Sequence, residues 1–148
     1  MLWLGAEHLE RYCQSMARRY AILDDNQRLL ERRIEELKGL LPGLIASRMC
    51  AAMVIGSVAE GRARDESDLD LLLVLRQGAP RRSDYGWWDR EVLPRLGALA
   101  DRRFSVQPVI IGRDSLATKE PHLRRAMKTG VVLWDPGGLF DDEPRLGA

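Results

Sequence analysis

Two apolar segments, residues 50–55 and 69–75, constrain the fold more than any other feature of this chain. Runs of this length, bounded by polar and turn-forming residues, are typical of buried strands. Asp68 and Asp70 stand where the second strand begins. Because side chains alternate between the two faces of a strand, these carboxylates point the same way, roughly 6 to 7 Å apart. Carboxylates so placed can converge on Mg²⁺, whose remaining positions are filled by water and phosphate oxygens.

Gly56 and Ser57 follow directly after the first of these strands. A glycine lets the backbone turn sharply and come close to a ligand, and successive N–H groups in such a turn can bind an anion. Ser57 adds a hydroxyl donor, and Gly61 is placed to close the turn. Either motif alone is ordinary, since Gly-Ser is usually a simple turn and Asp-x-Asp a solvated strand end. Together they predict a phosphate-binding turn followed by a metal site.

The segment from Gly56 to Asp70 resembles the signature of the nucleotidyltransferase superfamily related to DNA polymerase beta, especially its minimal nucleotidyltransferase branch. The resemblance covers about residues 27–134. It implies two bound Mg²⁺ ions, with Mn²⁺ as an alternative. The residues it implies in the site are Gly56, Ser57 and Ser67 for nucleotide binding, and Asp68 and Asp70 as catalytic metal ligands.

The chief departure from the family pattern lies in a strand expected at residues 103–111. Family members often carry a third carboxylate there, whereas this chain has Gln107. A Gln side chain offers a neutral carbonyl oxygen and cannot act as a base. Nucleotide and its metal could still bind, while activation of the acceptor hydroxyl would weaken. The structural alternative is that Gln107 is an ordinary polar residue of a strand.

The N-terminal segment carries apolar residues at helical spacing in two stripes, at positions 9–23 and 30–41. Asp24 and Gln27 have the separation of a capping box, which predicts a second helix beginning there, although one continuous helix is equally allowed. Residues 1–26 are expected to form a helical extension. This extension either packs on its own domain or provides a surface for a dimer or another partner.

The remaining elements follow from apolar spacing and breaker residues. All the elements together predict an α+β fold, with a mixed sheet of about four strands and helices packed mainly on one face, as in the nucleotidyltransferase fold. The tail at 135–148, rich in Pro, Gly and acidic residues, is expected to be loose. The further elements are helices at 84–100 and 114–128, the second capped by Gly130, and strands at 103–111 and 131–134.

The charge balance and cysteine content narrow the class of protein. With 23 basic and 22 acidic residues the net charge is +1, so no nucleic-acid partner is indicated. Cys13 and Cys50 are too few and too far apart for a zinc cluster. Without a secretory segment they predict reduced thiols and a cytoplasmic location. The apolar runs are far shorter than the ~20 residues of a membrane helix.

The resemblance implies transfer of a nucleoside monophosphate from a Mg-bound nucleoside triphosphate to a hydroxyl acceptor, with release of pyrophosphate. The fold alone does not indicate whether the acceptor is a small molecule, an RNA end or a protein side chain. A small helical partner protein, as in toxin–antitoxin-like pairs, or a homodimer could supply an acceptor-binding half. The alternative, which Gln107 favours, is a catalytically weak or inactive nucleotide-binding regulatory subunit, antitoxin-like in character. A third reading is a structural domain that keeps its strand aspartates without using them.

Overall fold

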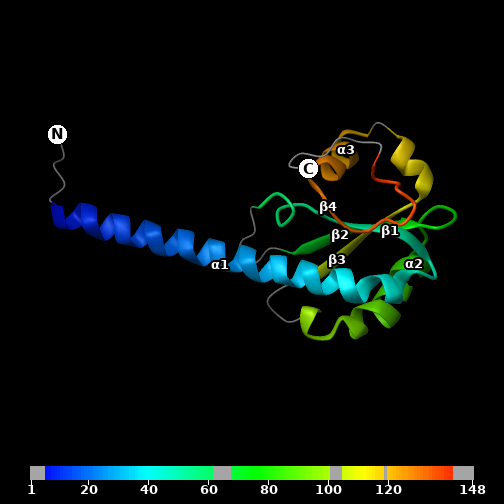
Figure 1. The fold of residues 1–148 in the computed structure, drawn as a ribbon, viewed down its shortest axis with the longest axis horizontal. Coiled ribbons are helices and arrows are strands. Elements are labelled where there is room, and N and C mark those ends of the chain that lie inside the picture. Colours follow the sequence, from blue (N-terminus) through cyan, green and yellow to red (C-terminus); the bar gives the residue numbers. More distant parts are fainter. Residues whose placement is uncertain (1–5, 62–67, 101–104, 119, 142–148) are drawn as a thin grey trace.

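The computed structural model describes residues 6–61, 68–100, 105–118 and 120–141, and Figure 1 shows how its elements are arranged. The elements in chain order are α1 (Ala6–Ile45), β1 (Met49–Ile55), β2 (Leu69–Leu75), α2 (Arg82–Trp87), the π-helical turn η1 (Trp88–Val92), the 3₁₀ helix η2 (Leu93–Ala100), β3 (Val106–Ile111), the 3₁₀ helix η3 (Arg113–Ala117), α3 (Pro121–Thr129) and β4 (Val131–Trp134).

The strands within these ranges form one mixed sheet of four, in the order β3-β2-β1-β4. β1 is antiparallel to both β2 and β4, whereas β2 and β3 run parallel. A parallel pair needs a crossover connection, and α2, η1 and η2 provide it between β2 and β3. The predicted α+β class and mixed sheet are therefore confirmed.

Helical segments cover the two faces of the sheet unequally (Figure 1). The larger core cluster joins the sheet to the C-terminal half of α1 and to α2, η1 and η2, while a smaller cluster lies against η3 and α3. Trp87 and Trp88 belong to the larger cluster, with 5% and 0% of their surface exposed. This pair is therefore core, and the helices pack mainly on one face as predicted.

α1 is a single helix of 40 residues, so the continuous alternative holds and Asp24 begins no helix of its own. Its N-terminal half extends beyond the sheet, and its C-terminal half packs on it (Figure 1). The helix also passes Pro42, which lies in its last turn. The cost of the missing N–H of this proline is offset because the same turn buries Ile45 completely. The buried stripe comprises Leu30, Ile34, Leu37, Leu41 and Ile45.

Two predicted helices are interrupted at prolines, and Pro94 was expected to allow a kink in the first of them. Residues 84–100 fall into α2, a π-helical turn and a 3₁₀ helix, because Pro94 has no N–H with which to continue the α-helical pattern. The helix predicted at 114–128 is wrong as a single element, since it divides into η3 and α3. Pro121 is the first residue of α3, and Glu120 caps it. Proline favours the first position of a helix, where its missing N–H has no partner to lose.

Gly130 stands at the C-cap of α3 as predicted, but for a different physical reason. Its φ of −66° is open to any residue, so no left-handed conformation is involved. A Cβ at this position would overlap the side chain of Met53 in β1 and lie 2.8 Å from the carbonyl oxygen of Ala126. Close packing of the end of α3 on the sheet therefore requires glycine here.

The chain remains ordered beyond β4, so the expectation of a loose tail does not hold for residues 135–141. Phe140 is completely buried in the smaller core cluster. The Asp135 carboxylate accepts hydrogen bonds from the backbone N–H groups of Leu139 and Phe140, at 2.8 and 2.9 Å. The predicted tail from residue 142 lies outside the described residues.

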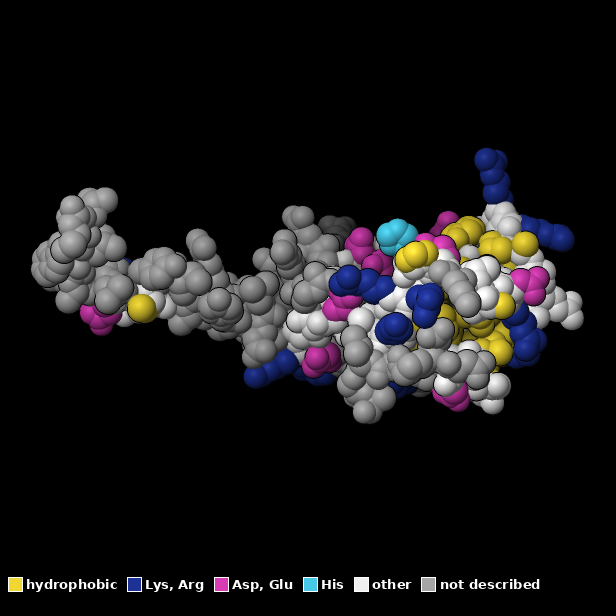
Figure 2. Space-filling model, turned by 90° about the horizontal axis from the view of Figure 1, so that it is seen from above, with side chains coloured by type: hydrophobic (Ala, Val, Ile, Leu, Met, Phe, Trp, Pro, Cys, Tyr) yellow, Lys and Arg dark blue, Asp and Glu magenta, His cyan; other side chains and the backbone are white. Residues whose placement is uncertain are grey.

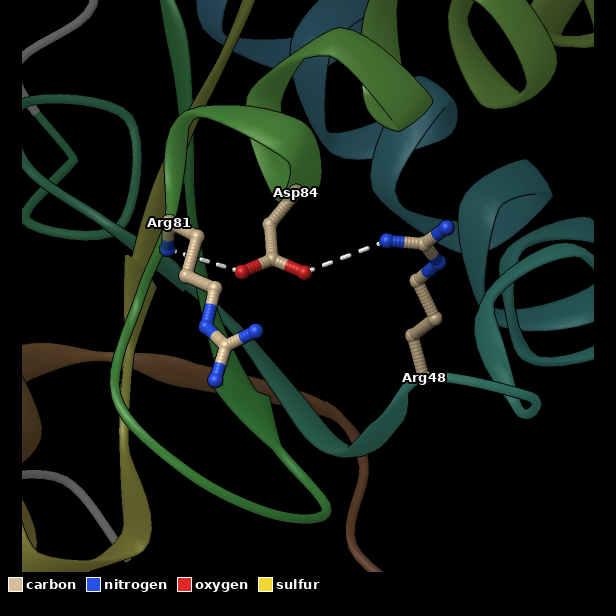
Figure 3. A network of polar contacts seen from close by, with 3 residues as sticks. All are labelled: Arg48, Arg81 and Asp84. Carbon is tan, nitrogen blue, oxygen red and sulfur yellow. Dashed lines mark hydrogen bonds and ion pairs between the residues drawn. The ribbon is translucent and has the colours of Figure 1, made fainter.

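A polar network ties the start of β1 to the start of α2 (Figure 3). The Asp84 carboxylate accepts a hydrogen bond from Arg48 Nη1 at 3.2 Å and another from the backbone N–H of Arg81 at 2.9 Å. The Arg48 guanidinium also lies over the ring of Trp87, 5.1 Å from its centroid. These contacts hold the crossover segment against the sheet.

Candidate functional site

The β1–β2 register brings the turn after β1 against the start of β2. Ile55, the last residue of β1, pairs with Asp70. Gly56 follows with a φ of +81°, and a Cβ built on it would lie 2.7 Å from Asp70 Oδ2. Both the left-handed backbone and the contact with the carboxylate therefore restrict this position to glycine. The two halves of the sequence motif therefore lie side by side at one end of the two central strands.

The turn after Gly56 is a single helical turn. The N–H of Glu60 donates to the carbonyl of Gly56 at 3.1 Å, and the N–H of Gly61 donates to that of Val58 at 3.1 Å. Gly61 has a φ of +74°, which explains why a glycine closes the turn. Ser57 is half-buried in this turn, beside the glycine that contacts Asp70.

Asp68 and Asp70 differ in their surroundings although they share a face of β2. Asp68 is exposed just before the strand, and its Oδ1 accepts a hydrogen bond from the hydroxyl of Ser105. The carbonyl of Ser105 in turn accepts the N–H of Leu69 at 2.8 Å. Asp70 lies within β2 and is half-buried. Sequence reasoning missed Ser105, because only the β2–β3 pairing shows that it lies beside Asp68.

The Asp70 carboxyl is held in an environment that disfavours its charge. Burial raises its pKa, and the charge of Asp68 raises that pKa further. A divalent cation would offset both effects. Among the described residues, no group of three or more His, Cys, Asp or Glu side chains could hold a metal. A carboxylate pair nonetheless fits Mg²⁺, which commonly binds one or two carboxylates together with water and substrate phosphates.

Gln107 lies directly beside this carboxylate pair. In the parallel β2–β3 register it is the partner of Asp70. Residues paired in register point to the same face of a sheet, with neighbouring strands ~4.8 Å apart. Gln107 is exposed there, so this neutral side chain stands at the position next to Asp70. Ser67, the remaining predicted nucleotide-binding residue, lies outside the described residues.

An apolar cavity of about 350 Å³ adjoins the site on the same face of the sheet. Its floor lies one side-chain row beyond Asp70 and Gln107, because Leu72 and Val109 are each two residues further along their strands. Sequence reasoning missed this cavity, since its lining comes from five separate elements and the loop before α3. The floor is Ile55, Leu72, Val109 and Ile111; Leu123 and Ala126 of α3 cover it; and Ser115, Thr118, Glu120 and His122 complete it.

A second hollow, of about 680 Å³, lies between α1, the turn at 58–61 and β4. Gln27 lines it and donates a hydrogen bond to the carbonyl of Val58 at 3.2 Å. Its lining includes Ile34 and Val58, which belong to the core cluster on the α1 side of the sheet. This hollow therefore belongs to the opposite face from the cavity beside Gln107.

Charged side chains of both signs lie on the outer surface. On the face drawn in Figure 2, the described acidic and basic side chains are intermixed over the body of the protein. Among the described residues, no helix combines the length and apolar character that crossing a bilayer requires.

No protein-family model and no curated protein matches the chain. Two solved structures resemble it over 70% of this chain and 77% of the matched chain. One is a toxin–antitoxin structure with AMP-PNP, at 14% identity and a TM-score of 0.45. The other is a mutant of the MntA–HpeT toxin–antitoxin, at 12% identity and a TM-score of 0.46. Likenesses this weak carry no argument about function, so any assignment depends on the site itself.

Proposed function

We propose that this chain is a nucleotidyltransferase that transfers a nucleoside monophosphate from a Mg-bound nucleoside triphosphate to a hydroxyl acceptor and releases pyrophosphate. Asp68 and Asp70 would hold Mg²⁺, or Mn²⁺, and Gly56 and Ser57 would bind the phosphates. Ser67 belongs to the same proposed nucleotide-binding set. When bound, the metal would neutralise phosphate charge and orient the reacting oxygens.

The observation that carries this proposal is the contact between the two motifs. A Cβ on Gly56 would lie 2.7 Å from Asp70 Oδ2, and this proximity supports assigning the turn and the acidic pair to one site. A metal held by the carboxylates would therefore lie beside any phosphate bound at the turn. Such proximity is what phosphoryl transfer needs, because catalysis of this reaction is mainly positioning and charge stabilisation.

The alternative proposal is a nucleotide-binding subunit with weak or no catalysis, and the specific observation favouring it is Gln107. This exposed amide is the register partner of Asp70, where a proton-accepting carboxylate would be useful. Both proposals require nucleotide binding and differ only in turnover. A partner, either a small helical protein or a second copy, remains part of both, because the N-terminal half of α1 extends beyond the sheet (Figure 1).

Calorimetric titration with Mg-ATP and Mg-GTP tests the shared requirement. We expect binding that disappears with EDTA and in Asp68→Asn and Asp70→Asn, with circular dichroism unchanged. Asp89→Asn, an exposed carboxylate in η1, serves as the matched control and should bind like the parent. Equal affinity in the parent and in the double Asn variant would refute the metal-site assignment. Release of pyrophosphate then separates the enzyme from the regulatory subunit.

A further inference from the structure

The three central positions of the site have a definite order across the sheet. Gly56 follows β1, Asp70 lies in β2, and Gln107 lies in β3, with β2 between the other two strands. If phosphates bind at the turn after β1, the leaving pyrophosphate lies on the β1 side of Asp70. In-line displacement places the attacking oxygen opposite the leaving group. The acceptor therefore approaches from the β3 side.

The apolar cavity lies on that approach. Of its four floor residues, Val109 and Ile111 belong to β3, the strand of Gln107. Val109 stands two residues beyond Gln107, which corresponds to roughly 7 Å along a strand. A compact acceptor can span this distance, with its hydroxyl beside Asp70 and its body in the cavity. Val109 is also 40% exposed, an unusual value for a large apolar side chain in this fold.

We propose that this cavity is the acceptor pocket, and that the acceptor is an alcohol whose hydroxyl is carried on a compact apolar group. This inference rests on the proposed transferase function. The floor and the covering α3 residues are aliphatic, and a volume of about 350 Å³ is at the small end of ligand pockets. Polyols and polycationic acceptors would leave their polar groups without partners against these walls, at a cost in affinity.

Some polar side chains at the edge of the cavity already form hydrogen bonds within the protein. Glu120 accepts the backbone N–H groups of His122 and Leu123 at 3.1 and 2.8 Å. The Thr118 hydroxyl donates to the carbonyl of Ser115 at 2.7 Å. These bonds hold the covering segment in place over the floor. They leave the aliphatic walls as the main contact surface for a ligand.

The reaction balances without any further reagent. The acceptor oxygen forms a bond to the α-phosphorus, and the bond from that phosphorus to the oxygen bridging to the β-phosphate breaks. Pyrophosphate carries away the bonding electron pair. The hydroxyl proton passes to solvent, because Gln107 cannot accept it.

The test measures three ligands separately on the full chain: Mg-ATP, Mg-tripolyphosphate and 2-naphthol, with glycerol as the polyol control. Ala126→Phe fills the cavity from α3, and Val109→Glu places a charge on its floor without changing the core. Ala117→Phe, on the exposed side of η3, is the matched control. We expect 2-naphthol to bind the parent and the control, and to bind both cavity variants at least about tenfold more weakly. Glycerol should not bind measurably.

Transfer of label from α-³²P-ATP to 2-naphthol should follow the same pattern and disappear in Asp70→Asn. Unchanged 2-naphthol affinity in both cavity variants, or no binding to the parent, would overturn the pocket assignment. A loss of Mg-ATP affinity in Ala126→Phe with Mg-tripolyphosphate affinity retained would also overturn it, because the cavity would then hold the nucleobase. Failure of Mg-ATP to bind the parent would instead refute the proposed function, whatever 2-naphthol does.

Discussion

Gly56 lies so close to Asp70 across the β1–β2 pair that a side chain at position 56 would displace the Asp70 carboxylate. The φ of Gly56 is +81°, and its absent Cβ would lie 2.7 Å from Asp70 Oδ2. Gly61 shares the left-handed backbone, with a φ of +74°, but a Cβ there would meet nothing within 4 Å. Substitutions at the two positions therefore share the free-energy cost of the left-handed backbone, whereas only a substitution of Gly56 also displaces the Asp70 carboxylate.

Gly56→Ala should destabilise the protein more than Gly61→Ala. Each variant places alanine at a positive φ, which costs about 1 kcal/mol, but only the first also displaces Asp70. Gly56→Ala should lose metal-dependent nucleotide binding, whereas Gly61→Ala should keep most of it. Urea unfolding and calorimetry measure the two effects. Equal losses of stability and affinity in the two variants would contradict the contact.

Asp70→Asn should stabilise the protein at neutral pH while abolishing nucleotide binding. Burial raises the pKa of Asp70 in the folded protein above its value in the unfolded chain. The protonated side chain therefore stabilises the fold fully below the unfolded-state pKa, and this stabilisation is lost as the pH rises through the folded-state pKa. The charged carboxylate therefore opposes folding at pH 7. Thermal unfolding without metal should show a higher Tm for Asp70→Asn than for the parent at pH 7. This difference in Tm should shrink as the pH falls toward 3.8, the ordinary pKa of an aspartate side chain. A lower Tm at pH 7 would refute this reasoning.

Ser57→Ala should weaken triphosphate binding by roughly 10- to 100-fold, because a hydrogen bond to a charged group contributes about 1.5 to 3 kcal/mol. The fold should be unaffected, since Ser57 lies in a half-buried turn rather than in the core. Calorimetry with Mg-ATP measures the change. As a control, Ser115→Ala at the cavity should leave the affinity for triphosphate unchanged. If Ser57→Ala bound Mg-ATP as tightly as the parent, the phosphates would have to bind elsewhere.

Gln107→Asp tests whether the site lacks a base. A carboxylate beside Asp70 should raise pyrophosphate release, since general-base assistance contributes typically 10²- to 10⁴-fold, with little change in nucleotide affinity. Pyrophosphate release with Mg²⁺ or Mn²⁺ is the measurement, and Asp70→Asn is the blank. A parent that is already fast and is slowed by the carboxylate would show that position 107 is not a vacant base position.

Asp84→Ala should lower the free energy of unfolding by about 1 to 3 kcal/mol, because it removes acceptors from both Arg48 and the backbone of Arg81. Asp84→Asn keeps one acceptor oxygen and should lose less. Nucleotide affinity should be unaffected in both, since Arg48 precedes β1 and Gly56 follows its other end. Equal stability of Asp84→Ala and the parent would mean that the ion pair contributes nothing to folding.

The strands and their turns could be predicted because the signals for them are local. Alternation places Asp68 and Asp70 on one face whatever the strand pairs with, and the motif spacing places Gly56 at a turn. The strand bounds Leu69–Leu75 and Val131–Trp134 agree with the predicted ones. The single helix predicted at 114–128 is wrong, because Pro121 lacks the N–H that would continue a helix from η3 and instead begins α3.

The sequence by itself predicted most of the candidate site residues, and only the tertiary structure decided which of them lie together. The parallel β2–β3 register places Gln107 beside Asp70 and Ser105 beside Asp68. The cavity combines β1, β2, β3, η3 and α3. Pairing and packing of this kind depend on contacts between segments far apart in the chain, whose free energies arise from burial of the whole core. No local pattern of residues contains that information.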